Sequence, residues 1–350
     1  MFKQNGFKQN GNIMAKRIVT VFGGSGFIGR HLVRKLAAAG AIVRVAVRDP
    51  EDARYMMTMG DVGQIVPFAA DVKRPETLSA AVNGATSVVN LVGLLSEWGQ
   101  QNFDNIHAQG AGNVAAAAKA AGVQDLVQIS AIGADENSEA RYAQTKAAGE
   151  AAVKAAFPGV TIIRPSVVFG AEDHFFNYFA GLSRFTWVMP VFGCPGFPIF
   201  KWFQDDTALQ IDFYGDGGTK FQPVYVGDVA DGIIASLGSD AAKGQTYELG
   251  GPTVYSSVEI MKLLLENVAR KRILAPIPFW YLAIVGWFLQ KIPAPLLTYD
   301  QVKLLEVDNV VGEGAKTLAD LGVAATPAEA ILPDYLTRFK RVGHEVASSV

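Results

Sequence analysis

Three glycines, each three residues after the last, mark a stretch of the sequence that could bind phosphate. Gly23, Gly26 and Gly29 follow an apolar, β-branched run at 17–22, and a helical pattern of leucines and valine begins directly behind them. A tight turn between a strand and a helix lets backbone N–H groups approach a pyrophosphate, whose charge the helix dipole favours. A glycine-rich turn with only a structural role is the alternative, but the position between strand and helix favours a dinucleotide site. The residues expected to line this site are Gly23, Gly24, Ser25, Gly26, Phe27, Ile28 and Gly29.

A tyrosine and a lysine four residues apart could transfer protons. Tyr142 and Lys146 fall in a predicted helix, where residues with this spacing share a face. An ordinary phenol has a pKa of about 10, and a nearby ammonium lowers that pKa because it stabilises the phenolate. Ser130 ends the predicted strand before this helix, where its hydroxyl would reach a substrate oxygen. A chance Tyr-x-x-x-Lys is the alternative, but this position favours Ser130, Tyr142 and Lys146 as the catalytic set.

The residue after the second predicted strand selects the nucleotide. An arginine there can bind a 2′-phosphate, whereas an acidic residue binds a ribose 2′-hydroxyl. Arg48 is the first residue after the strand 42–47, and Asp49 follows it. The bidentate guanidinium of Arg48 favours NADPH, with Arg44 as a second cation if it faces the same way. NADH bound through Asp49 is the alternative.

The ends of the next two strands should also approach the nucleotide. Asp71 and Val72 follow the third strand, where Asp71 either meets the adenine or caps a helix. Leu91, Val92 and Gly93 lie at the end of the fourth strand, where a small residue permits close approach of the cofactor.

These residues need a parallel sheet to bring them together. Short β-branched runs alternate with alanine-rich helical stretches up to about residue 170, which predicts an α/β fold: a Rossmann-type doubly wound parallel sheet with helices on both faces. The carboxyl ends of its strands form the ligand site. The strands are predicted at 17–22, 42–47, 64–68, 87–92, 126–130 and 160–164, and the helices at 28–39, 75–82, 104–121 and 140–156.

The sequence divides into three parts. Residues 1–15 contain a tandem Phe-Lys-Gln-Asn-Gly repeat and are expected to be a disordered extension. Residues 16–170 form the dinucleotide-binding domain, and 171–345 form a smaller, aromatic-rich α/β region interleaved with it. Eleven aromatic residues between 175 and 203 would line an apolar substrate pocket or contact a partner. Helices are predicted to begin at Asp228 as an N-cap, at a capping box of Ser256 with Glu259, and at Thr326-Pro327 with Glu329.

Composition excludes several classes of function. The net charge of −2 and the absence of a basic stripe argue against nucleic acid as a partner. The single cysteine, Cys194, permits no internal disulfide and no cysteine-based metal site. The four histidines have no metal-ligand spacing, so we expect no bound metal and place them at the surface or as caps: His31, His107, His174 and His344.

Together these motifs resemble the extended or atypical short-chain dehydrogenases/reductases over residues 16–340. The glycine turn, Ser130 and the Tyr142–Lys146 pair carry the resemblance, together with Ile-Arg-Pro at 163–165 and Pro-Val-Tyr-Val-Gly-Asp-Val-Ala at 223–230. The resemblance implies that Arg164 and Pro165 border the cofactor. Only twelve residues separate Ser130 from Tyr142, a shorter gap than in the sugar epimerases of this family, so the pair would survive as cofactor ligands without a substrate contact.

More narrowly, the chain resembles the NAD(P)H-binding accessory subunits of respiratory complex I and their bacterial relatives. Further residues suggest this: Lys146-Ala-Ala-Gly-Glu150, Ala156-Phe157-Pro158 and the run 168–173. The resemblance implies an NADPH-holding subunit without turnover, bound to other complex I subunits where the peripheral arm meets the membrane. Its location would be the cytoplasmic side of a bacterial inner membrane, or the matrix side in mitochondria. An NADP-dependent reductase, dehydrogenase or epimerase acting on a hydrophobic substrate is the alternative.

An uncharged aromatic stretch at 279–289 could contact the membrane surface. Eleven helical residues span about 16 Å, which is too short to cross a bilayer. Basic residues flank the stretch, and tryptophan and tyrosine suit the lipid interface. The residues alone favour a buried helix, whereas the resemblance favours contact with the membrane or a membrane-embedded partner.

Overall fold

The chain folds into two units whose segments alternate along the sequence. The computed structural model describes residues 17–97, 99, 102–195, 199–204, 207–292 and 295–340, so the predicted extension at 1–15 lies outside the described residues. Unit 1 comprises the described residues of Met1–Pro165, Val226–Leu249 and Gly312–Ala324. Unit 2 comprises those of Ser166–Tyr225, Gly250–Val311 and Ala325–Val350.

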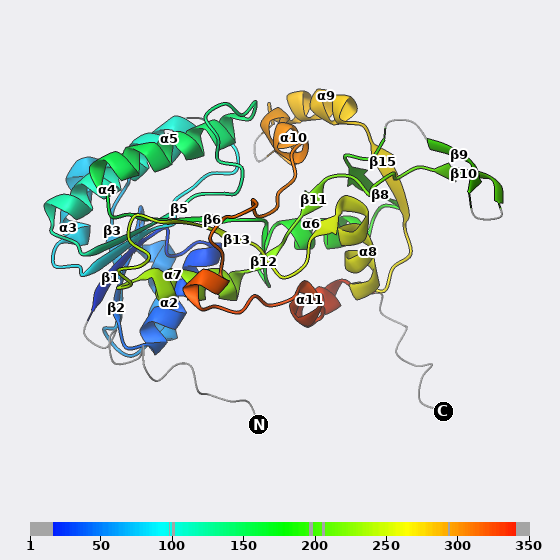
Figure 1. Ribbon diagram of the computed structural model, residues 1–350. Coiled ribbons are helices and arrows are strands. Elements are labelled where there is room, and N and C mark those ends of the chain that lie inside the picture. Colours follow the sequence, from blue (N-terminus) through cyan, green and yellow to red (C-terminus); the bar gives the residue numbers. More distant parts are fainter. Residues whose placement is uncertain are drawn as a thin grey trace, which may run out of the picture. The chain divides into compact units, whose positions relative to one another are not determined.

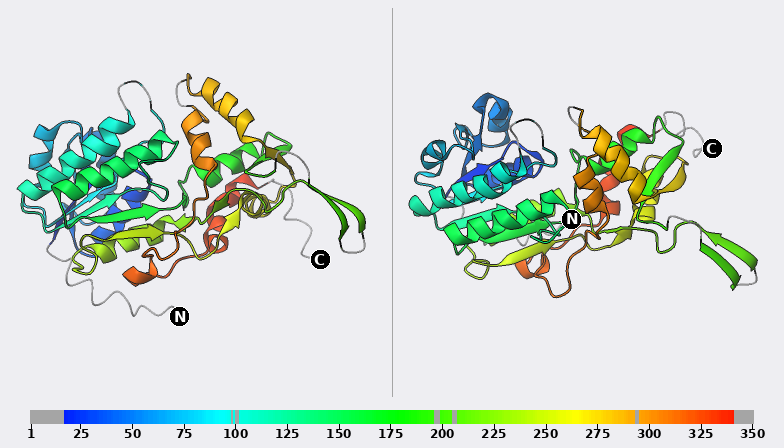
Figure 2. Two further views of the ribbon diagram at one scale, coloured as in Figure 1. Left: turned by 45° about the horizontal axis from the view of Figure 1, so that its top comes forward. Right: turned by 90° about the horizontal axis from the view of Figure 1, so that it is seen from above.

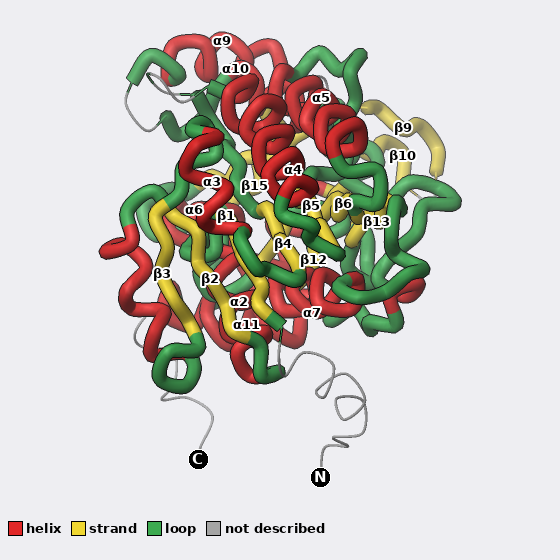
Figure 3. Tube along the Cα trace, turned by 90° about the vertical axis from the view of Figure 1, so that its left-hand side faces the viewer, coloured by secondary structure: helices red, strands yellow, loops and turns green. Residues whose placement is uncertain are grey.

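Seven parallel strands form the sheet of unit 1. Their order is β13-β6-β5-β4-β1-β2-β3, which Figure 3 shows as a fan running from β3 to β13. The order reverses at β1, where β4 lies on one side and β2 on the other, and this switch point is where doubly wound sheets bind ligands. The strands are β1 (Ile18–Phe22), β2 (Ile42–Val47), β3 (Ile65–Ala69), β4 (Ser87–Asn90), β5 (Asp125–Ile129), β6 (Thr161–Pro165) and β13 (Thr246–Leu249).

Helices cover both faces of this sheet, as Figure 1 shows. One layer contains α3 (Pro75–Val82), α4 (Ala111–Ala120) and α5 (Arg141–Ala156), and the other contains α2 (Phe27–Ala38) and α7 (Val226–Ser236). The central strands are therefore buried on both sides, which explains their continuous apolar runs. Lys35 on α2 and Asp231 on α7 form an ion pair of 2.7 Å across the second layer. Shorter helical segments complete the unit: η1 (Pro50–Met59), η2 (Asp104–Gly110) and η3 (Ala319–Leu321).

The predicted strands and helices of the first 165 residues match the structure to within a few residues. Sequence reasoning missed β13, because it is four residues long and follows α7 far along the chain. Asp228 is not an N-cap: α7 begins at Val226, which places Asp228 in its first turn. Ser256 and Glu259 do form the predicted capping box. The last helix begins at Ala328, with Pro327 at the N-cap and Glu329 in the first turn, within two residues of the predicted start.

Unit 2 surrounds an aromatic core. Phe169 and Phe176 are fully buried there, and Phe175 packs against them. The buried carboxylate of Asp173 accepts hydrogen bonds from the Tyr335 hydroxyl and from the Phe176 amide, while burial raises its pKa. The elements are β7 (Val168–Phe169), α6 (Phe175–Leu182), β8 (Val188–Phe192), β9 (Ile199–Gln204), β10 (Thr207–Asp212), β11 (Lys220–Phe221), β12 (Val224–Tyr225), β14 (Tyr255–Ser256), α8 (Ser257–Asn267), β15 (Ile273–Ile277), α9 (Phe279–Leu289), α10 (Tyr299–Leu305), α11 (Ala328–Leu336) and η4 (Thr337–Phe339).

Helices α9 and α10 pack closely against each other at the top of Figure 1, and Figure 2 shows the same pairing from two other sides. A Cβ on Gly286 would lie 2.9 Å from the carbonyl carbon of Thr298, so only glycine permits this approach. The aromatic block at 175–203 divides between core and surface. Phe179 and Phe192 are buried, whereas Phe185 and Trp187 are exposed, and the side chains at 197–203 lie outside the described part.

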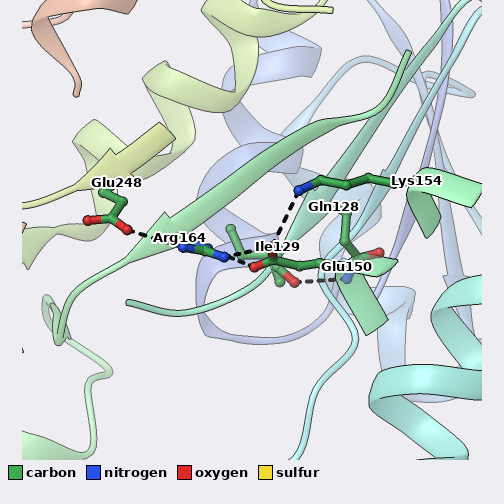
Figure 4. Close-up of polar contacts among 6 residues, drawn as sticks. All are labelled: Gln128, Ile129, Glu150, Lys154, Arg164 and Glu248. Carbon is green, nitrogen blue, oxygen red and sulfur yellow. Dashed lines mark hydrogen bonds and ion pairs between the residues drawn. The ribbon is translucent and has the colours of Figure 1, made fainter. Parts of the chain in front are cut away.

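A buried ion network joins three elements of unit 1 beside the sheet (Figure 4). The Arg164 guanidinium on β6 donates to both carboxylate oxygens of Glu150 on α5, at 2.8 and 2.9 Å. It also lies 3.3 Å from Glu248 on β13. Because Glu150 accepts these hydrogen bonds and the carboxylates are negative, the pKa of Arg164 is raised. The network thus stabilises the edge strand β13 against the helix layer.

Replacing Glu150 by glutamine should lower the local stability of unit 1 by about 3 kcal/mol, because the largely buried guanidinium then loses its bidentate partner. The matched change Glu248→Gln should cost only about 1 kcal/mol, since that contact is longer and more exposed. Hydrogen exchange of the β6 and α5 amides measures both effects. Equal protection in the two variants would contradict this role for Glu150.

Candidate functional site

The turn between β1 and α2 packs so closely against Gly29 that no side chain fits at that position. A Cβ on Gly29 would lie 2.5 Å from the carbonyl oxygens of Gly23 and Gly24. Gly23 itself has a φ of +72°, which favours glycine, and its carbonyl accepts the Gly26 amide at 3.0 Å. Helix α2 begins at Phe27 with no side-chain cap and no acidic residue in its first turn. Its N–H groups at Phe27 and Ile28, next to Ser25, can therefore serve an anion.

The end of β4 lies directly against this turn. A Cβ on Gly23 would be 3.2 Å from the backbone of Leu91 and Val92. Gly93 is exposed, and a Cβ there would lie 3.2 Å from Lys146 Nζ. The absence of a side chain at Gly93 thus makes room for the Lys146 ammonium. The structure brings together the glycine turn, the 91–93 segment and the lysine of the predicted pair.

A buried histidine holds this arrangement in place. His107 Nε2 accepts the backbone N–H of Leu94 at 2.9 Å, so the ring proton lies on Nδ1. Nδ1 donates to the Thr145 hydroxyl at 3.1 Å, and that hydroxyl donates to the Tyr142 carbonyl. The ring also stacks on Phe103 and meets Tyr142 edge-on. His107 therefore ties the segment after β4 to the first turn of α5.

The expectation that His107 is a surface or capping residue was wrong, since its exposed fraction is 3%. The π-helical geometry of η2 carries it inward, and such geometry is frequent at functional sites. Gly149 on α5 permits the approach, because a Cβ there would collide with the His107 carbonyl oxygen. The signal in the sequence was Gly149 itself, a glycine inside a helical pattern.

Tyr142 and Lys146 lie on one face of α5, as predicted. Lys146 Nζ is 5.6 Å from the centre of the Tyr142 ring. Burial raises the pKa of Tyr142 to about 12 and lowers the pKa of Lys146 to about 8. The ammonium was expected to lower the phenol pKa, but burial of the ring dominates. Tyr142 is therefore a neutral phenol near neutral pH, able to donate a proton but not to accept one.

Ser130 has an unused hydroxyl. It follows β5, is 5% exposed, and its Oγ makes no hydrogen bond within the described part of the chain. A buried hydroxyl without a partner is costly, so this oxygen is suited to a bound ligand.

Of the charged residues on and after β2, two already bind groups of the protein and one is an exposed arginine. Asp49 accepts the Glu51 N–H at 3.0 Å and caps η1, whereas Arg48 is exposed. Arg44 donates to the carbonyl oxygens of Ala81 and Asn83, so its guanidinium is held at the end of α3. Arg48 is thus the cation of this pair left for a ligand.

The other residues predicted to contact the cofactor also make hydrogen bonds or ion pairs within the protein. Asp71 accepts the Lys73 N–H at 3.0 Å, which is the turn-capping role, and the Val72 carbonyl accepts Asn113 Nδ2. Arg164 is bound by Glu150 and Glu248, and the Pro165 carbonyl accepts the Ile132 N–H. No sequence signal marked Tyr55, whose hydroxyl donates to the Ser25 carbonyl of the glycine turn.

The buried, neutral state of His107 predicts a dependence of stability on pH. Burial, with the nearby Lys146 charge, lowers its pKa from 6.5 to about 3. Below about pH 6.5 the unfolded chain binds a proton that the folded chain does not, so stability falls as pH falls. Between about pH 7 and about pH 5 the loss should be about 2 kcal/mol larger than in His107→Gln. Urea unfolding followed by circular dichroism measures this difference, and identical pH profiles would contradict it.

Comparisons with known proteins agree with this geometry. A family model described as NAD(P)H-binding matches residues 23–173. The mitochondrial NADH dehydrogenase [ubiquinone] 1 alpha subcomplex subunit 9 of Arabidopsis thaliana is 32% identical over 345 residues, covering 95% of this chain and 80% of the relative. The same subunit of Mus musculus is 32% identical over 316 residues, covering 89% and 78%.

Among solved structures, UDP-glucose 4-epimerase of Thermus thermophilus in complex with NAD superposes with a TM-score of 0.64. Its sequence identity is 20%, over 92% of this chain and 98% of that chain, so it supports the fold alone.

Proposed function

Because this chain belongs to the family of NADH dehydrogenase [ubiquinone] 1 alpha subcomplex subunit 9, we propose that it is an NADPH-holding accessory subunit of respiratory complex I. In this role it binds other complex I subunits where the peripheral arm meets the membrane. Its side of the membrane is the cytoplasmic one in a bacterium and the matrix one in a mitochondrion. The nucleotide stabilises the fold by mass action and is not turned over.

The observation that carries the proposal is the fit of unit 1 to a dinucleotide. The glycine turn, where a Cβ on Gly29 would strike two carbonyl oxygens, presents the uncapped start of α2 to a diphosphate. The unused Ser130 hydroxyl and the Lys146 ammonium beside Gly93 offer polar groups to the rest of the ligand. The chemistry that a reduced nicotinamide would offer at this site is hydride transfer, which the holding role leaves unused.

The different roles of Arg48 and Asp49, the two residues after β2, favour NADPH over NADH. Asp49, the residue that would bind a ribose hydroxyl, already caps η1. Arg48 is exposed, and a guanidinium there pairs with a 2′-phosphate in bidentate fashion.

The state of Tyr142 argues against one kind of turnover, the oxidation of an alcohol, whereas a neutral phenol can still donate the proton of a reduction. Proton abstraction needs a phenolate, and burial holds the pKa of this phenol at about 12. The His107 ring meets Tyr142 edge-on and binds Thr145 on the same helix, which fixes the position of the phenol. The pair then acts by holding the nucleotide.

Helix α9 supports contact with the membrane surface. Its side chains Trp280, Ile284 and Phe288 are between 50% and 68% exposed, and Lys291 Nζ lies 3.5 Å from the centre of the Trp287 ring. Exposed aromatics beside a lysine are typical of interfacial helices. No helix in the described ranges is both long and apolar enough to cross a membrane.

Arg48→Ala should weaken NADPH binding roughly 10- to 100-fold and leave NADH binding nearly unchanged, because a charge-assisted pair with the 2′-phosphate is lost. Arg44→Ala is the matched control. It removes the same charge four positions earlier, within β2, where the guanidinium already binds carbonyl oxygens. Isothermal titration with both nucleotides measures the ratio, and an equal loss for the two would contradict the assignment of NADPH.

The retained Tyr142–Lys146 pair favours one second candidate, an NADP-dependent reductase of a hydrophobic carbonyl compound. Tyr142→Phe separates the two functions. It should leave recovery with complex I unchanged and nucleotide content nearly so, because Lys146 and the glycine turn keep their places beside the ligand. Loss of a measurable NADPH-dependent reduction in this variant would instead support the reductase.

A further inference from the structure

A groove in unit 2 combines positive charge with aromatic surface. Its volume is about 1230 Å³, more than a drug-sized ligand needs. Four cations and one carboxylate, that of Glu266, line it beside Trp187 and Tyr214. The cations are Lys262, Arg270, Lys271 and Arg272. Since the whole chain carries a net charge of −2, this positive charge is a local feature.

Two parts of unit 2 form this groove: the β8–β15 strand pair and the segment that follows α8. Strands β8 and β15 pair in parallel, and the Ile273 N–H donates to the Trp187 carbonyl, which sets Arg272 beside Trp187. Helix α8 ends at Asn267, and Ala269, at a φ of +51°, turns the chain out of the helix into the basic run 270–272.

Part of the groove is already fixed in place. Arg272 donates to the carbonyl oxygens of Ser183 and Lys271, and its guanidinium lies 5.2 Å from the centre of the Trp187 ring. Lys262 and Lys271 are exposed, and within the described residues neither ammonium makes a hydrogen bond or ion pair. Lys262 shares its charge with the nearby Glu259 carboxylate, and the two exposed ammonium groups beside a fixed guanidinium suit a phosphate.

The groove also exposes apolar side chains, which indicates that its ligand has an apolar part beside the phosphate. Trp187 is 79% exposed and Ile273 is 69% exposed, while Leu265 and Leu274 lie deeper in the groove. A small soluble phosphate would leave this apolar surface in water, whereas an acyl chain would cover it.

We propose that this groove binds the phosphate headgroup and upper acyl chain of an anionic phospholipid in a bilayer. The site is separate from α9 and does not rest on the nucleotide-holding role. Helix α9 meets the interface through exposed aromatics, whereas the groove selects lipid charge.

Co-sedimentation of the full chain with vesicles tests the site. Vesicles of phosphatidylcholine with phosphatidylglycerol should bind more tightly than phosphatidylcholine alone. Lys262→Ala and Lys271→Ala should each weaken this binding roughly fivefold, and the double variant roughly 25-fold, since each cation near an anionic surface contributes about this much. Lys220→Ala, an exposed lysine of unit 2 outside the groove, is the matched control and should bind as the wild type does.

A second readout locates the contact. Brominated acyl chains should quench Trp187, and Trp187→Phe should remove that component and leave any quenching of Trp280 and Trp287 on α9. Wild-type binding to anionic vesicles by the double variant would overturn the proposal, as would equal binding to neutral vesicles. Displacement of the vesicles by glycerol phosphate would assign the groove to a soluble phosphate instead.

Recovery of the double variant with complex I shows whether the groove binds a lipid or another protein. If the double variant binds vesicles normally but is lost from complex I, the groove holds an acidic protein surface and the lipid assignment is wrong. The double variant should carry as much bound nucleotide as the wild type. A negative result for lipid binding therefore does not affect the proposed nucleotide-holding role.

Discussion

The contact on which unit 1 depends is the approach of helix α2 to the turn that precedes it. With Gly29 in contact with the carbonyls of Gly23 and Gly24, the first N–H groups of α2 lie at the carboxyl end of β1. No side chain caps them, which in a helix of twelve residues leaves polar groups to be satisfied from outside. A phosphate satisfies them, so the structural constraint and the binding function share one cause.

The second constraint is the link through His107. Its ring hydrogen bonds reach the segment after β4 on one side and α5 on the other, so the two parts of the site move together. The ring must stay neutral for this, because Nε2 accepts while Nδ1 donates. The same burial that keeps His107 neutral also raises the phenol pKa of Tyr142. A site arranged this way does not favour proton abstraction from an alcohol near neutral pH.

The sequence was sufficient for the parts of the fold that local pattern dictates. The strand–turn–helix at 17–39 was predictable because β-branched residues, glycines and the helical period each fall in separate stretches. The capping box at Ser256 and Glu259 was predictable for the same reason. Strand β13 was not, because its pairing with β6 depends on residues about eighty positions apart. His107 was not either, since burial in a π-helical turn follows from packing against Gly149 and not from its neighbours in sequence.

The central claim is that the β1–α2 turn holds the diphosphate of a reduced nicotinamide nucleotide. The most direct measurement is the nucleotide released when the natively purified protein is denatured, identified by chromatography and compared with Gly29→Ala. The account predicts stoichiometric NADPH from the wild type, a rise in Tm when NADPH is added after stripping, and loss of both in the variant. Wild-type protein that carries no nucleotide and shows no change in Tm with NADPH or NADH would contradict it.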